Sequence, residues 1–324
     1  MVLVALIAAT LPAVDIATNG IARRIAGLDP AVCLSRFVDY PPSRGKLGFP
    51  RCLWEKPFPT NDKFWLKDVD FSCASPWNDT CGAVRAGTLI SKRHIIFAKH
   101  FPLWKGCRIL FVDQAGGGCP VRVKATKALE KCDIAIGSLE YEVTPSIHPA
   151  KILPEDYGKY IGEGKGLPIV TFNQCEQMVL SECQRITTNG VTNAATKNPA
   201  WNPLMGNMIV GDSGNPAFLL IGNEPILLYC LYSGGVGHGP AIHRYRNEIQ
   251  KAMDELCPGY KLEAFDFAAF DRPQVAPFCL SGAMLGRLAR GAGWAARWAT
   301  GAREGNTRQR RMKHTAQTMT RHRP

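Results

Sequence analysis

Short apolar runs, each bounded by glycine, proline or polar turns, recur along most of this chain. The runs 87–91, 94–98 and 108–112 are typical. Glycine contributes 31 and proline 23 of the 324 residues, which favours frequent turns over long helices. Only residues 246–256 place their apolar side chains clearly at helical spacing. Many short strands with one late helix predict an all-β sandwich or barrel.

Changes in composition divide the sequence into four parts. Residues 1–60 form an N-terminal extension with irregular, proline-rich stretches. Residues 61–145 and 146–262 hold two groups of predicted strands, and the aromatic run 64–71 is expected to be a strand of the first group. Residues 263–324 are rich in Arg, Ala, Gly and Thr, and we expect this tail to be disordered.

The positive charge of the chain is concentrated in that tail. The formal net charge is +12, and residues 282–324 contain ten arginines and lysines against one acid, Glu304. A nucleic acid or an acidic membrane surface is therefore expected as a partner only through the tail. A solvated tail without such a partner is the alternative that the composition favours.

The N-terminus and the cysteines bear on the cellular compartment. The apolar run 3–14 has the length of a signal-peptide core, which would place a signal peptide at 1–20, but no Lys or Arg precedes it. A buried first strand or helix is the alternative.

The even count of 12 cysteines favours an oxidising compartment, with Cys73–Cys81 and Cys175–Cys183 as local disulfides. Buried free thiols are the alternative. We expect a secreted or periplasmic protein without a membrane span, because no apolar run reaches 18 residues.

Three segments carry residues suited to nucleophilic catalysis. His100 closes an apolar run, Asp133 opens another, and Ser213 lies in the tetrapeptide 211–214, Gly-Asp-Ser-Gly. A serine hydroxyl needs a neighbouring base, and a histidine held by a carboxylate can act as one. Glycines beside the serine allow the N–H groups of Gly211 and Ser213 to converge on a developing oxyanion.

Other residues compete for these roles. Asp113 also follows His100 and ends an apolar run, but Asp133 has the better apolar context. His238 and His243 follow Ser213 and would be the bases in a GDS-type esterase. No Asp-x-x-His pair follows Ser213, and the β-rich pattern does not fit such an α/β enzyme.

With these segments in the order His, Asp, Ser, residues 88–256 resemble the trypsin-like (chymotrypsin-fold) serine peptidases. The resemblance implies two antiparallel six-stranded β-barrels, a catalytic triad in the cleft between them and a closing C-terminal helix. It implies a serine endopeptidase that cleaves polypeptides through an acyl-enzyme. His100 would be the base, Asp133 the orienting carboxylate and Ser213 the nucleophile.

The resemblance also implies where the substrate lies. Asn207, six residues before the serine, takes the place of the floor of the primary specificity pocket. Ser233, Gly234 and Gly235 resemble the strand that holds the substrate backbone. An asparagine at the floor does not favour Lys or Arg substrates. The usual cysteine after the catalytic histidine is Phe101 here, so the disulfide across that loop is absent.

Two charged positions raise further expectations. Lys99 adds a positive charge beside His100, which would lower the imidazole pKa if the two groups were close. The segment 24–27 loosely resembles an activation cleavage site, whose new amine would pair with Asp212. An ordinary basic segment is the alternative.

Other functional classes have little support in the sequence. Cys-x-x-Cys pairs and His-x-x-x-His spacings are absent, and the glycines at 116–118 lack the lysine of a phosphate loop. We therefore expect neither a metal nor a cofactor, and a monomer whose partner is a polypeptide substrate. A catalytically inactive binding module on the same fold, with the tail as its interacting part, is the alternative function.

Overall fold

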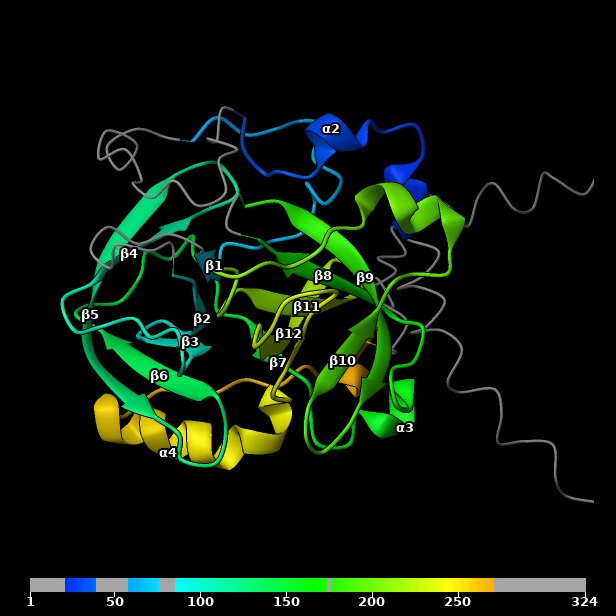
Figure 1. Ribbon diagram of the computed structural model, residues 1–324. Helices are drawn as coiled ribbons and strands as arrows, with labels where there is room; N and C mark the ends of the chain where they lie inside the picture. Colours follow the sequence, from blue (N-terminus) through cyan, green and yellow to red (C-terminus); the bar gives the residue numbers. More distant parts are fainter. Residues whose placement is uncertain (1–20, 39–57, 76–84, 174–175, 271–324) are drawn as a thin grey trace, which may run out of the picture. The chain divides into compact units, whose positions relative to one another are not determined.

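The computed structural model describes residues 21–38, 58–75, 85–173 and 176–270 (Figure 1). Strands dominate this part of the chain and form two sheets, which confirms the prediction of an all-β fold. The predicted signal peptide at 1–20 lies outside the described residues, and so does the tail from residue 271.

The first sheet has six antiparallel strands in the order β1-β2-β3-β6-β5-β4. The hydroxyl of Ser75 on one edge strand donates to the carbonyl of Leu110 on the other, so the sheet curls nearly into a barrel. The predicted runs 87–91, 94–98 and 108–112 are all strands of this sheet. Its members are β1 (Ala74–Ser75), β2 (Gly87–Ser91), β3 (His94–Ala98), β4 (Arg108–Val112), β5 (Gly118–Ala128) and β6 (Ile134–Leu139).

The second sheet has seven strands in the order β13-β10-β9-β8-β11-β12-β7. The expected number was six, all antiparallel, and this detail is wrong, since two-residue strands extend both edges and β7 pairs in parallel with β12. The members are β7 (Lys151–Ile152), β8 (Pro168–Phe172), β9 (Met178–Ile186), β10 (Val191–Ala194), β11 (Pro216–Ile221), β12 (Glu224–Cys230) and β13 (His238–Gly239).

The predicted late helix is present as α4 (Arg246–Leu256), which lies along β5 and β6 (Figure 1). Its buried Ile249, Ala252 and Met253 face the core. The other helical segments are short: α2 (Pro30–Cys33), α3 (Gly158–Ile161), α5 (Phe267–Phe270) and the 3₁₀ turns η2 (Pro199–Leu204) and η3 (Ile242–Tyr245). Among the described helices, none has the length and apolar character that crossing a membrane requires.

The expected strand at 64–71 is instead a series of turns. The amide of Lys67 donates to the carbonyl of Phe64. Phe64, Trp65 and Leu66 are buried and the next two residues are exposed, so the run does not alternate between two faces as a half-buried strand would. At the end of this run, Phe71 packs edge to face on Phe172 and Phe218 of the second sheet, at ring-centroid distances of 5.5 and 5.4 Å. Packing of its apolar side chains into the core overrides the strand-like pattern of this run.

Both ends of the described chain are more ordered than the composition suggests. Residues 21–38 of the predicted extension pack onto the core, where Ile21 and Cys33 are buried. The predicted tail begins too early, because residues 263–270 belong to the fold. Ile152 donates its amide to the carbonyl of Glu263, and the amide of Phe265 donates back to Ile152.

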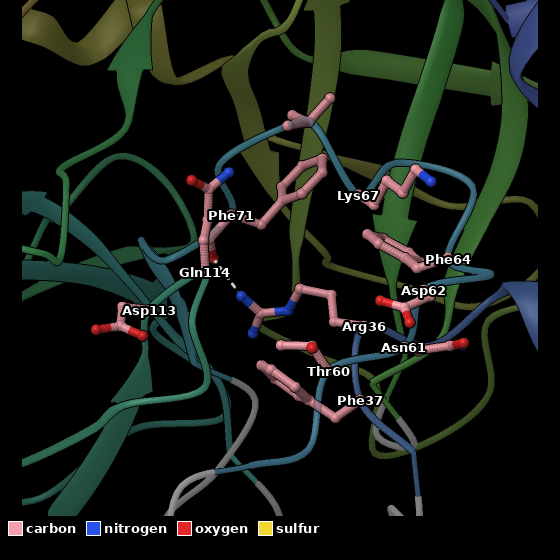
Figure 2. A pocket seen from close by; sticks show the side chains of 11 residues that line it. Arg36, Phe37, Thr60, Asn61, Asp62, Phe64, Lys67, Phe71, Asp113 and Gln114 are labelled. Carbon is pink, nitrogen blue, oxygen red and sulfur yellow. Dashed lines mark hydrogen bonds between the residues drawn. The ribbon is translucent and has the colours of Figure 1, made fainter.

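A buried ion pair connects the N-terminal segment to the second sheet. The guanidinium of Arg36 pairs with the carboxylate of Glu176, beside β9, and also donates to the carbonyl of Phe71 at 3.1 Å. Figure 2 shows Arg36 with the ring of Phe37 on one side and that of Phe71 on the other. Burial raises the pKa of Glu176 to about 7, against the opposing effect of Arg36. The ionised form of Glu176 is fully buried and therefore depends on its partner.

We expect Arg36→Met to lower the free energy of unfolding by about 3 kcal/mol, because it leaves the Glu176 carboxylate buried without its cation. The double variant Arg36→Met/Glu176→Met should lose less than the sum of the two single variants. Urea denaturation of all four proteins measures both quantities. Strictly additive losses would show that the two side chains are not coupled.

A buried histidine makes stability depend on pH. The Nε2–H of His94 on β3 donates to the carbonyl of Met253 on α4 (3.1 Å). The Nδ1 of the neutral ring therefore accepts from the Ser91 hydroxyl (2.8 Å). Burial lowers the pKa of His94 from 6.5 to about 4. The unfolded chain therefore binds this proton at a higher pH than the folded protein does.

The free energy of unfolding should accordingly fall as the pH drops from 6.5 to 4, with about 2 kcal/mol of the loss due to His94. In His94→Gln the same acidification should cost less by about that amount. Thermal unfolding at several pH values measures the slope for each protein. Equal slopes in the two proteins would contradict the assignment.

Candidate active site

The pairing of β3 with β6 brings His100 and Asp133 together. These strands are antiparallel with Ala98 opposite Ile134, so the residues after β3 face the residues before β6. Both oxygens of Asp133 bind His100: Oδ1 accepts from the backbone N–H at 2.8 Å, and Oδ2 lies 2.6 Å from Nδ1. Because a carboxylate accepts the Nδ1 hydrogen, Nε2 is left with the lone pair that a general base needs.

The competing carboxylate, Asp113, lies elsewhere. Its Oδ1 accepts from the amides of Ala115 and Gly117 at 3.0 and 2.7 Å, so it stabilises its own turn. The structure therefore brings Asp133 to His100, and Asp113 remains in the β4–β5 connection. The imidazole is open to solvent, with 39% of the His100 side chain exposed against 13% for Asp133.

The Gly-Asp-Ser-Gly tetrapeptide forms a tight double turn before β11. The amide of Asp212 donates to the carbonyl of Ile209, and the amide of Asn215 donates to that of Asp212, at 3.0 and 3.1 Å. Buried Asp212 also accepts the Ile209 amide on its carboxylate at 2.8 Å. Gly211 has a φ of 99°, in the left-handed region that favours glycine. This turn leaves Ser213 half-buried at its tip.

The serine turn packs against the end of the strand that carries His100. A methyl group added to Gly214 would lie 3.5 Å from the amide nitrogen of Ala98 and 3.6 Å from the carbonyl of Ala86. Ala98 is the last residue of β3, two positions before His100. The fold thus brings the serine turn beside the strand end from which the His100–Asp133 pair projects.

The backbone around Ser213 offers hydrogen-bond donors. In the described part of the chain, the N–H groups of Gly211 and Ser213 donate to no acceptor. Neighbouring Val210 is almost fully exposed, at 99%. These two N–H groups are therefore available as donors to an anionic oxygen.

The predicted substrate-binding residues also lie together. Met208 and Gly235 exchange two backbone hydrogen bonds, at 2.7 and 3.0 Å, which places exposed Asn207 beside the segment 233–235. A methyl group on Gly234 would approach the Met208 carbonyl to 2.9 Å, so this close pairing requires glycine. The hydroxyl of Ser233 lies 3.0 Å from Nδ1 of His238.

The histidines that follow Ser213 have other environments. His243 is buried against the ring of Tyr157, and burial lowers its pKa to about 4. His238 contacts Ser233 as described. Neither contact involves Ser213, so the described contacts give no support to a base that follows the serine.

Lys99 and Arg24, the two further charged residues singled out in the sequence, both contact other parts of the fold. The ammonium of Lys99 donates to the carbonyl of Leu129 at 2.9 Å, on the loop that leads to Asp133. Arg24 belongs to a helical turn, forms an ion pair with Asp68 and donates to Asn223. Cleavage after Arg24 would therefore act on an already packed segment.

Tyr232 is a neighbour of His100 that was not predicted as a site residue. Its ring meets the imidazole edge to face at a centroid distance of 5.4 Å and a tilt of 75°. The ring is 49% exposed and lies 5.5 Å from that of His238. The only indication in the sequence that Tyr232 lies at the site was its position immediately before Ser233.

A second His–Asp pair occurs outside this site. Nδ1 of His148 lies 2.6 Å from Oδ2 of Asp70, and the His148 amide donates to the hydroxyl of Ser72. The two residues line a separate cavity with Cys73, Pro225 and Phe270. This pair has the same contact distance as His100–Asp133 and provides a matched control.

The cavity around Arg36 contains no comparable chemistry (Figure 2). It has a volume of about 240 Å³, and the described residues around it include Asn61, Lys67 and Asp113 but no histidine. It therefore lacks a base of the kind found at His100.

Eight cysteines lie in the described region, and none of them is bonded to another of the eight. Burial raises the pKa of Cys132 to about 11 and that of Cys183 to about 12, which disfavours the thiolate. Cys81 and Cys175, the proposed partners of Cys73 and Cys183, lie outside the described residues. The described residues also contain no group of three acidic, histidine or cysteine side chains that could hold a metal.

In comparisons with known proteins, no protein-family model and no curated protein matches this chain. The likeness to trypsin-like peptidases therefore remains a resemblance, supported by the residues and their geometry.

The geometry predicts the tautomer of His100. In the folded protein at pH 8, Nδ1 should carry the hydrogen and Nε2 should not, because Asp133 accepts from Nδ1. Asp133→Asn should abolish this preference, since an amide can donate to Nδ1 instead. Long-range ¹H–¹⁵N spectra of the imidazole report the tautomer directly. An unchanged tautomer in the variant would argue against control by Asp133.

Proposed function

We propose that this protein is a serine endopeptidase of the chymotrypsin type. The observation that carries the proposal is the two-point contact of Asp133 with His100, at the strand end against which the Ser213 turn packs. The two sheets support a two-barrel arrangement, in which a nearly closed six-stranded sheet adjoins a seven-stranded one.

In the proposed reaction, Nε2 of His100 removes the hydroxyl proton as Oγ of Ser213 attacks the peptide carbonyl. Asp133 keeps the Nδ1 hydrogen and stabilises the imidazolium that forms. The N–H groups of Gly211 and Ser213 bind the oxyanion. The tetrahedral intermediate then collapses to an ester on Ser213, while His100 returns the proton to the departing amine.

Deacylation repeats these steps with water. His100 removes a proton from the water as its oxygen attacks the ester carbonyl, and the proton passes to Oγ of Ser213 when the acid product leaves. The segment 233–235 and Asn207 would align the substrate beside the scissile bond. Asn207 supplies no carboxylate, so the proposal does not include selection of Lys or Arg.

Labelling with a fluorescent fluorophosphonate tests this function, because the reagent reacts with an activated serine. We expect labelling on Ser213, its loss in Ser213→Ala, and a fall by a factor of about 10⁴ or more in His100→Ala. Peptide mapping of the labelled protein confirms the position.

The control variant is His148→Ala, which removes the other histidine held by an aspartate at 2.6 Å. It should label at the wild-type rate. Absence of labelling in well-folded wild-type protein would reject the peptidase and favour the inactive binding module. Equal losses in His100→Ala and His148→Ala would show that the effect is one of folding.

A further inference from the structure

A polar cavity of about 460 Å³ adjoins the His100–Asp133 pair. The loop before β6 contributes one wall, with Lys131 and Asp133. The second sheet contributes the other wall, from β9, β10 and β13. Tyr232, whose ring contacts His100, also lines the cavity, so the cavity reaches the proposed catalytic base.

Three side chains form a row across the second sheet. Thr192 on β10 lies opposite Arg185 on β9 and opposite His238 on β13. All three are exposed, whereas the adjacent Val191 and Ile186 are buried. Because neighbours in register share a face of a sheet, Arg185, Thr192 and His238 point to the same side, which is the side that lines the cavity.

The cavity lining carries more cations than carboxylates. Lys131 and Arg185 are exposed cations, and the described residues provide neither with an ion-pair partner. The single acidic side chain in the lining is Asp133, whose two oxygens are occupied by His100. The closest carboxylate along β9, Glu182, accepts from Thr196 and the Lys197 amide instead. Two cations in a cavity without a free carboxylate attract an anionic group.

Ring contacts connect this row to the reacting groups. The ring of His238 lies 5.5 Å from that of Tyr232, which lies 5.4 Å from that of His100. His238 also contacts Ser233, in the segment proposed to hold the substrate backbone. An anionic group in the cavity would therefore belong to the same extended peptide that lies along 233–235.

We propose that Arg185 and Lys131 select acidic side chains, so that the preferred substrate is a polypeptide with Asp or Glu close to the scissile bond. This inference rests on the proposed function, whose substrate class it names. A polynucleotide fits less well, because its binding needs a series of phosphate contacts and the cavity offers two permanent cations.

The test measures binding to the full-length Ser213→Ala variant, so that it does not depend on catalysis. Two fluorescent decapeptides are compared, identical except for three Glu residues in one and three Gln in the other. We expect the Glu peptide to bind at least about fivefold more tightly in 50 mM salt, with most of the difference lost at 500 mM.

Matched variants locate the effect. Arg185→Gln and Lys131→Gln, each in the Ser213→Ala background, should reduce the preference to about twofold or less, and Arg185→Lys should retain most of it. Lys124→Gln removes an exposed cation of β5 outside the cavity and should leave the preference unchanged. Equal binding of the two peptides, or binding of neither, would overturn the inference. Tighter binding of an oligonucleotide of equal charge to the same residues would also overturn it.

The two proposals fail separately. Fluorophosphonate labelling of Ser213 without a preference for the Glu peptide would reject the proposed selection of acidic substrates and retain the proposed peptidase. A preference for the Glu peptide without labelling would remove the peptidase and leave a site for acidic peptides.

Discussion

The contact of the Asp133 carboxylate with the backbone and ring of His100 is the interaction on which the site depends. It forms because the β3–β6 register places the two residues at the same end of adjacent strands. The loop before Asp133 is fixed from both sides, since Leu129 donates its amide to Ile134 and accepts from the ammonium of Lys99. A carboxylate held in this way orients the imidazole before any substrate arrives.

Core contacts also fix the N-terminal and turn-rich segments on the second sheet. Phe71, Phe172 and Phe218 meet with ring centroids 5.4 to 6.0 Å apart, between the turn-rich segment and the second sheet. Arg36 extends this contact by joining the N-terminal segment to Glu176. Close aromatic packing disfavours sliding of the turn-rich segment along the second sheet.

Local sequence patterns predicted many strands and the main helix correctly. They failed for segments whose conformation is set by tertiary contacts. The strands at 87–91, 94–98 and 108–112 follow from short apolar runs that are buried almost throughout. The helix at 246–256 follows from periodicity, because it buries its apolar face. The run 64–71 has a strand-like pattern, yet it folds as turns whose apolar side chains are buried in the core. The two-residue strands β7 and β13 are too short for any pattern to indicate them.

The candidate site shows the same division. An apolar strand following Asp133 distinguished it from Asp113, which agrees with the observed contact to His100. Tyr232 and the row through Thr192 were not found, because their proximity depends on strand pairing that no local pattern specifies. The pairing of Arg36 with Glu176 joins residues 140 positions apart, and for the same reason it has no local signature.

The two cations of the cavity beside Asp133 come from separate parts of the fold, Lys131 from the loop before β6 and Arg185 from β9. The distance between the Lys131 and Arg185 charges therefore depends on how the two sheets pack against each other. Any rearrangement that tilts one half against the other would alter which acidic groups both charges can reach at once. The affinity of the protein for acidic peptides would then depend on how its two sheets pack together, and it would change before the protein unfolds.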